Sequence, residues 1–178
     1  AFYFLQSLLI NLGLGYPFSL LYTAAFTAIL LLLWRTLPRV QKVLVGISSL
    51  VAACYFPFAQ AYGAPNFNTL LALHSTNMEE STEILTIFPW YSYLVGIFIF
   101  ALGVIAIRRK KESEKARWNT FDSLCLVFSV ATFFVAPVQN LAWGGVFKLK
   151  DTGYPVFRFA KDVIVNNNEV IEEQERMA

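Results

Sequence analysis

The chain has 178 residues, of which 57% are hydrophobic and 15% are charged, and its formal net charge is +2. Ordinary soluble domains carry about 25% charged residues, so the composition argues against a soluble domain. It also argues against a nucleic-acid-binding protein, because the sequence has no basic stripe with interleaved aromatic residues. Four long ranges carry no Asp, Glu, Lys or Arg, namely 1–34, 43–78, 84–107 and 123–147. Since a soluble helix or strand needs one aqueous face, these runs indicate helices that span a lipid bilayer.

Five apolar segments follow one another along the chain, and we predict that each forms a transmembrane helix. They cover residues 2–14, 17–34, 43–62, 90–107 and 124–143. Gly13, Gly15 and Pro17 predict a tight turn between the first two segments. The first segment is short, and we interpret it as the remainder of a longer helix because the chain starts inside an apolar run. The predicted fold class is therefore an all-α integral membrane protein with five transmembrane helices and further helices at the outer interface.

The charged loops between these segments predict how the chain is oriented in the bilayer. Residues 35–42 carry three basic side chains and no acid, and residues 108–117 carry six basic side chains against two glutamates. Residues 64–87 instead carry three glutamates and no Lys or Arg. Because cytoplasmic loops are enriched in Lys and Arg, the first two loops are predicted to be cytoplasmic and the third to lie outside. The N-terminus is then cytoplasmic, and the C-terminus lies outside.

The last part of the chain, 147–178, differs in character from the membrane region 1–146. Apolar residues at helical spacing are interleaved there with charged ones, which predicts an amphipathic helix at the outer membrane–water interface. The apolar positions are Val156, Phe159, Val163 and Ile164, and the charged positions between them are Arg158, Lys161 and Asp162. The acidic residues that follow are typical of a linker, so we expect a further domain after this helix.

The outer loop 64–87 is the polar segment in which ligand binding is most plausible. Asn68 is a favourable N-cap for a short helix. The residues that would share one face of a helix after it are Thr76, Asn77, Glu80 and Ser81. Their carboxylate, amide and hydroxyl oxygens can accept hydrogen bonds from an ammonium group. The same residues are also typical of helix capping and of a solvated acidic face. The spacing alone favours this second interpretation over ligand binding. His74 is likewise more typical of a polar interface than of a catalyst.

The sequence contains no recognisable catalytic centre of its own. No nucleophile stands beside a base, and no cluster has the spacing of zinc ligands. The two cysteines, Cys54 and Cys125, lie in separate apolar segments and predict neither a disulfide nor a metal site. We therefore predict no catalytic residue, no metal and no cofactor in this chain.

The outer loop and its flanks carry a resemblance to a known family. Tyr62-Gly63 closes the third segment, a polar helix ends in Ser75-Thr76-Asn77-Met78-Glu79-Glu80, and an aromatic-led segment follows. Together with the five-segment layout and the amphipathic tail, this resembles the membrane domain of bacterial phosphoethanolamine transferases, which belong to the alkaline phosphatase/sulfatase-like superfamily. The sequence is most similar to the enterobacterial enzymes that modify osmoregulated periplasmic glucans.

The resemblance implies part of a transferase of the bacterial inner membrane, with the outer loop and the C-terminus in the periplasm. The implied partners are the phospholipid bilayer, phosphatidylethanolamine as donor and a glucan as acceptor. Catalysis and zinc binding are implied for a C-terminal periplasmic domain that this chain lacks, so the chain alone is expected to be inactive. The family places a carboxylate near the donor headgroup, which corresponds to Glu80. An Asn expected eight residues earlier is Ala72 here, with Asn68 as a candidate replacement. The candidate substrate-binding residues are Glu80, Asn77, Thr76, Asn68 and His74.

Two other interpretations stay open at this point. The chain can be a structural membrane anchor, or a small transporter subunit, with no role in donor binding. The transporter is disfavoured because the apolar segments carry no charged residue at depth and no paired broken helices.

Overall fold

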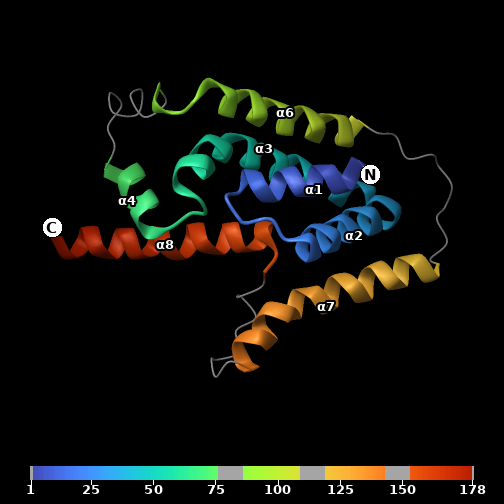
Figure 1. The fold of residues 1–178 in the computed structure, drawn as a ribbon. Coiled ribbons are helices and arrows are strands. Elements are labelled where there is room, and N and C mark those ends of the chain that lie inside the picture. Colours follow the sequence, from blue (N-terminus) through green and yellow to red (C-terminus); the bar gives the residue numbers. More distant parts are fainter. Residues whose placement is uncertain (1, 76–85, 109–118, 143–152, 178) are drawn as a thin grey trace.

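The computed structural model describes residues 2–75, 86–108, 119–142 and 153–177. Every regular element within these ranges is a helix, as the sequence predicts (Figure 1). The helices are α1 (Phe2–Gly13), α2 (Leu20–Thr36), α3 (Pro38–Tyr62), α4 (Phe67–Ser75), α6 (Trp90–Arg108), α7 (Thr120–Ala142) and α8 (Pro155–Met177). α1 packs against α2, α3 and α6, while α7 packs mainly against α2 and α4 packs against α8.

Each of the five predicted membrane segments is occupied mainly by a helix, and three of these helices reach the length of a membrane span. These are α3, α6 and the residues Thr120–Gln139 of α7. α1 has 12 residues and α2 has 17. They therefore rise about 18 Å and about 26 Å, against a hydrocarbon core of about 30 Å. The prediction of an all-helical membrane protein is confirmed, whereas the count of five spans is not, because α1 and α2 are shorter than that core.

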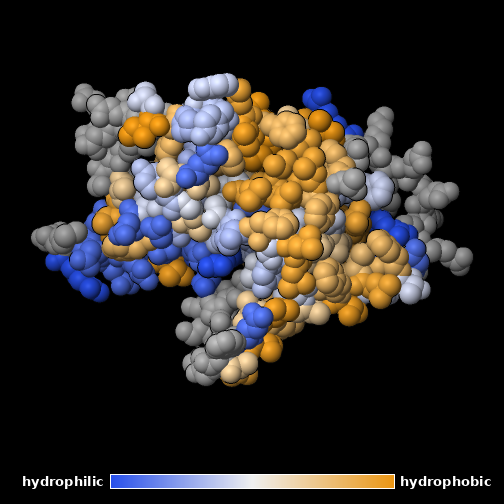
Figure 2. Space-filling model, in the orientation of Figure 1, coloured by the Kyte–Doolittle hydropathy of each residue, from blue (hydrophilic) through white to orange (hydrophobic). Residues whose placement is uncertain are grey.

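The outward faces of the long helices are apolar. Leu94, Ile97 and Phe98 of α6 are all more than half exposed, as are Leu124 and Val127 of α7. Figure 2 shows that apolar residues gather over the middle of this face, while hydrophilic residues cover α8 and the two ends. An apolar surface of this extent is unfavourable in water and is typical of helices that contact lipid.

Polar side chains occupy the interior of the helix group. Gln6 of α1 donates a hydrogen bond from Nε2 to Oγ of Ser49 on α3 at 3.2 Å. Asn11 of α1 donates from Nδ2 to Oγ1 of Thr23 on α2 at 3.1 Å. All four residues are buried. Hydrogen bonds of this kind stabilise helix contacts where the outer surface faces lipid, because apolar burial alone gives little preference for the bundle interior there.

The turn between α1 and α2 forms as predicted and packs against the end of α3. Gly15 has φ of 79°, a left-handed conformation that favours glycine. A side chain at Gly15 would overlap the carbonyl group of Gly63, the residue that follows the end of α3. The close approach of these two backbones brings Tyr16, the next residue, to the same end of the molecule as α4.

At its opposite end, α2 is joined to the start of α7 by a pair of charges. Nη1 of Arg35 lies 3.2 Å from Oδ1 of Asp122, whose side chain is 2% exposed. Asp122, the third residue of α7, also forms a reciprocal pair of bonds with Asn119, the residue before the helix. The Asn119 amide donates to Oδ2 of Asp122, and the Asp122 amide donates to Oδ1 of Asn119, both at 3.1 Å. One carboxylate thus caps α7 and holds it against α2.

α8 forms at the position of the predicted amphipathic helix. Just before it, the buried Tyr154 donates a hydrogen bond from its hydroxyl group to the carbonyl oxygen of Ser129 on α7 at 2.8 Å. Val156, Phe159 and Val163 are half-buried, whereas Ile164 is exposed. The apolar residues therefore divide between a packed face and an outward face, instead of forming one common stripe.

Candidate functional site

The residues that the sequence singled out for substrate binding lie on or after α4. Thr76, Asn77 and Glu80 fall outside the residues that the structure describes. Asn68 and His74 are both on α4 and both exposed. They are six residues apart, so they point from different faces of the helix. The structure therefore does not bring these two side chains together.

The prediction that Asn68 caps this helix is wrong, because α4 begins one residue earlier, at Phe67. Asn66 takes the capping role. Its Oδ1 accepts a hydrogen bond from the amide of Thr69 at 3.0 Å and another from the Thr69 hydroxyl group at 3.2 Å. Asn68 lies inside the first turn and presents its side chain to the outside.

His74 links the end of α4 to α8. Its Nε2 lies 2.9 Å from Oδ1 of Asn167. This contact agrees with the interpretation of His74 as a polar interface residue. It also places the end of α4 beside α8.

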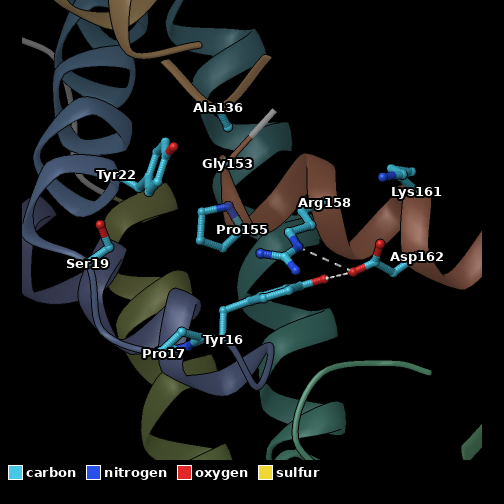
Figure 3. Close-up of a pocket in the computed structure, with 10 residues that line it drawn as sticks. All are labelled: Tyr16, Pro17, Ser19, Tyr22, Ala136, Gly153, Pro155, Arg158, Lys161 and Asp162. Carbon is cyan, nitrogen blue, oxygen red and sulfur yellow. Dashed lines mark hydrogen bonds and ion pairs between the residues drawn. The ribbon is translucent and has the colours of Figure 1, made fainter. Parts of the chain in front are cut away.

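A larger polar feature lies nearby, at the start of α8. It is a cavity of about 500 Å³ between the α1–α2 turn, α7 and α8 (Figure 3). The residues that line it are Tyr16, Pro17, Ser19, Tyr22, Ala136, Gly153, Pro155, Arg158, Lys161 and Asp162. We call this cavity the charged pocket. Its lining brings together two basic side chains, one carboxylate and three hydroxyl groups.

Three side chains at the mouth of the charged pocket form a connected group. The hydroxyl group of Tyr16 donates a hydrogen bond to Oδ2 of Asp162 at 2.7 Å. Nε of Arg158 lies 3.6 Å from the same oxygen. The guanidinium carbon of Arg158 stands 5.0 Å from the centre of the Tyr16 ring. This stacking and pairing fix the position of the guanidinium group over the ring.

The terminal nitrogens of Arg158 are available to a ligand. In Figure 3 they lie on the side of the guanidinium group that is turned away from Asp162. The Arg158 side chain is 52% exposed and that of Asp162 is 20% exposed, so the pocket is open to solvent on the arginine side. Its lining carries both signs of charge.

The environment of Tyr16 keeps its phenol protonated. Burial, followed by the hydrogen bond to Asp162 and the charge of that carboxylate, raises the pKa of Tyr16 above its ordinary value of 10.0. The nearby Arg158 acts in the opposite direction with a smaller effect. Tyr16 is therefore a fixed hydrogen-bond donor to Asp162 at physiological pH.

Sequence reasoning named the charged residues of α8 but gave them no role. Arg158 and Asp162 are four residues apart, the spacing at which side chains on a helix can pair. That signal was available, although it is common on solvated helices. The partner Tyr16 is 146 residues away from Asp162, and no local pattern connects them.

The described residues offer no evident metal site. Among residues 2–75, 86–108, 119–142 and 153–177, no group of three or more His, Cys, Asp or Glu side chains is placed to hold a metal ion.

Comparison with known proteins bears on the predicted resemblance. The chain is 98% identical over all 178 residues to Phosphoethanolamine transferase OpgE of Escherichia coli (strain K12). The resemblance is confirmed. The chain spans 34% of the length of that protein, so it corresponds to part of an enzyme. No family model and no solved structure matches the chain.

Proposed function

We propose that this chain is the membrane module of a phosphoethanolamine transferase. The observation that carries the proposal is the 98% identity to such a transferase over the whole chain. The apolar outer surface of α3, α6 and α7 supports placement in a bilayer. We assign α1 and α2 to the bilayer as well, since the bilayer can thin locally around a short helix at a modest cost in free energy.

In this proposal the protein lies in the bacterial inner membrane, with its N-terminus in the cytoplasm and α4 and α8 in the periplasm. The basic range 35–42 and Arg108, the last residue of α6, lie at one end of the long helices, and α4 lies at the other. The positive-inside rule then favours a cytoplasmic position for the basic end. The charged pocket is at the opposite end, which is the end that a periplasmic catalytic domain would face.

The module would serve the transfer of phosphoethanolamine from phosphatidylethanolamine to an osmoregulated periplasmic glucan. The name of the E. coli relative supports phosphoethanolamine as the transferred group. The donor, the acceptor and the zinc ion of the catalytic domain are inferred from the resemblance. We place the donor headgroup near Glu80, where a carboxylate can pair with its ammonium group.

The test uses the full-length transferase that carries this chain. Glu80→Ala should reduce transfer from labelled phosphatidylethanolamine by at least about tenfold, because a charge-assisted hydrogen bond contributes roughly 1.5–3 kcal/mol. The matched control is Glu83→Ala in the same acidic cluster, which should leave transfer within about twofold of the parent enzyme, because the resemblance assigns the donor headgroup to Glu80 and not to Glu83.

Unchanged transfer in Glu80→Ala would remove this residue from the donor site. A second measurement tests the role of the module as a whole. Residues 1–146 are replaced by an unrelated membrane anchor, and the chimera is assayed for transfer. Full activity would show that the membrane region is only an anchor, and loss of transfer with retained membrane insertion supports the proposal.

A further inference from the structure

We propose that the charged pocket binds the zwitterionic headgroup of a phospholipid. Its phosphodiester would contact Arg158, and its primary ammonium group would contact Asp162. The identification of the lipid as phosphatidylethanolamine rests on the proposed function. The class of headgroup rests on the pocket itself.

The charges of the lining argue for a ligand that carries both signs. A simple anion would be attracted by Arg158 but repelled by Asp162, and a simple cation would be attracted by Asp162 but repelled by Arg158. A phosphodiester joined by a short linker to an ammonium group satisfies both, because each charge finds a partner of opposite sign. The cavity of about 500 Å³ is large enough for such a group.

The hydrogen bonds already made within the pocket leave suitable atoms for this ligand. Tyr16 and Arg158 both contact Oδ2 of Asp162, and within the described part of the chain no partner of Oδ1 is found. Oδ1 can therefore accept a bond from an ammonium group. Since Nε of Arg158 faces Asp162, its two terminal nitrogens remain for a phosphate oxygen. Arginine is well suited to this role because its fork matches two phosphate oxygens.

The position of the pocket agrees with the depth of lipid headgroups. Tyr16 follows the end of α1, and Ala136 lies in the last third of α7. The pocket is thus level with the ends of apolar helices whose outer faces contact lipid. Headgroups lie at this level of a bilayer. Pro17 and Ala136 supply apolar walls on the side of the helices, and the hydroxyl group of Ser19 adds a polar contact.

A purely structural role is the alternative. The bond between Tyr16 and Asp162 also holds α8 against the α1–α2 turn, and a group that only positions α8 would not distinguish between lipids. The experiment therefore measures lipid selectivity and not stability alone.

Full-length enzyme is purified in detergent and titrated with single phospholipids, and bound lipid is counted by native mass spectrometry. The parent enzyme should bind phosphatidylethanolamine at least about tenfold more tightly than phosphatidylglycerol, which has a phosphodiester but no ammonium group. Asp162→Asn should bring the two affinities within about twofold of each other. Arg158→Gln should weaken the binding of both lipids by about tenfold, and Arg158→Lys should retain part of the affinity that Arg158→Gln loses.

The matched control is Glu169→Gln, which removes an exposed carboxylate elsewhere on α8 and should change neither affinity. Soluble glycerophosphoethanolamine is added as a competitor to identify the source of the headgroup. Displacement of lipid at comparable concentration shows that the headgroup alone is recognised, and failure to displace shows that the acyl chains are needed as well. Both results support headgroup binding, provided that the lipid selectivity is present.

Equal binding of the two lipids by the parent enzyme would overturn the inference. So would unchanged selectivity in Asp162→Asn, with thermal unfolding used to confirm that the variant is folded. These outcomes are separable from failure of the proposed function. If the enzyme selects between the lipids but Glu80→Ala leaves transfer unchanged, the donor site at Glu80 is refuted. If Glu80→Ala abolishes transfer but Asp162→Asn leaves lipid selectivity unchanged, lipid binding in the charged pocket is refuted.

Discussion

The ion pair between Arg35 and Asp122 gives a prediction about how α7 is held in place. The pair is asymmetric, since the side chain of Arg35 is 27% exposed and that of Asp122 is 2% exposed. Removing the arginine leaves a buried carboxylate without its counter-charge. Removing the carboxylate leaves an arginine that water can reach. The first change should therefore destabilise the protein more than the second.

The magnitude follows from the separation of 3.2 Å between Nη1 of Arg35 and Oδ1 of Asp122. The Coulomb energy at this separation is about 5 kcal/mol at an effective dielectric constant of about 20, and about 1.3 kcal/mol in water. Because Arg35 is partly hydrated, we expect a loss of about 2 kcal/mol for Asp122→Asn, which still offers an oxygen to the Asn119 amide. Arg35→Gln should cost about 3 kcal/mol, in the range found when one partner of a buried pair is removed.

The double variant Arg35→Gln/Asp122→Asn is the sharpest measurement. It removes the uncompensated carboxylate, so it should be more stable than Arg35→Gln alone by about 1 kcal/mol. Unfolding of the purified protein is followed by tryptophan fluorescence in detergent. A loss of about 2 kcal/mol should lower the Tm by roughly 4–8 °C for a protein of this size. If adding Asp122→Asn made Arg35→Gln less stable, the assignment of the cost to a buried unpaired carboxylate would be wrong.

Three further predictions concern other contacts of the fold. A side chain carbon at Gly96 would lie 2.7 Å from the carbonyl oxygen of Ala53, so Gly96→Ala should destabilise the α3–α6 contact by about 1–3 kcal/mol in the same unfolding assay. Tyr16→Phe should cost about 1–2 kcal/mol near neutral pH. Because the folded state raises the pKa of Tyr16, this contribution is fully present below the ordinary value of 10.0 and is lost as the pH rises through the higher folded value. The difference in Tm between parent and Tyr16→Phe should therefore be constant from about pH 6 to about pH 9 and shrink at strongly alkaline pH. His74→Ala and Asn167→Ala should each cost about 1 kcal/mol or less, and the double variant no more than either, when measured by chemical unfolding.

The apolar helices could be predicted from the sequence because the bilayer imposes one simple requirement on each of them. A charged side chain is costly at the membrane centre, so charge-free runs mark the segments that contact lipid. Their ends were predicted less well, because a helix continues past the hydrocarbon core. α3 begins at Pro38, five residues before the predicted start at Val43. Arg39 and Lys42 fall in this extra part, where long basic side chains can reach the aqueous interface.

The charged pocket could not be predicted, because its members come from opposite ends of the chain. Tyr16 belongs to a turn that the glycines of the sequence did predict, and Asp162 belongs to a helix whose amphipathic pattern was also recognised. Neither local pattern predicts the packing that brings Tyr16 and Asp162 together. The same limit explains the error at α4, where Asn66 and Asn68 are equally good capping residues by type, and the path of the chain after α3 decides between them.

α8 connects the two candidate sites of this chain. Asp162 lines the charged pocket, and Asn167 contacts His74 at the end of α4. These two α8 residues are five positions apart, which corresponds to about 7.5 Å along a helix. A headgroup in the pocket would thus lie close to the end of α4. If both proposals hold, changes at Asp162 and Asn167 should alter lipid selectivity and transfer together, whereas changes at the exposed far end of α8 should alter neither.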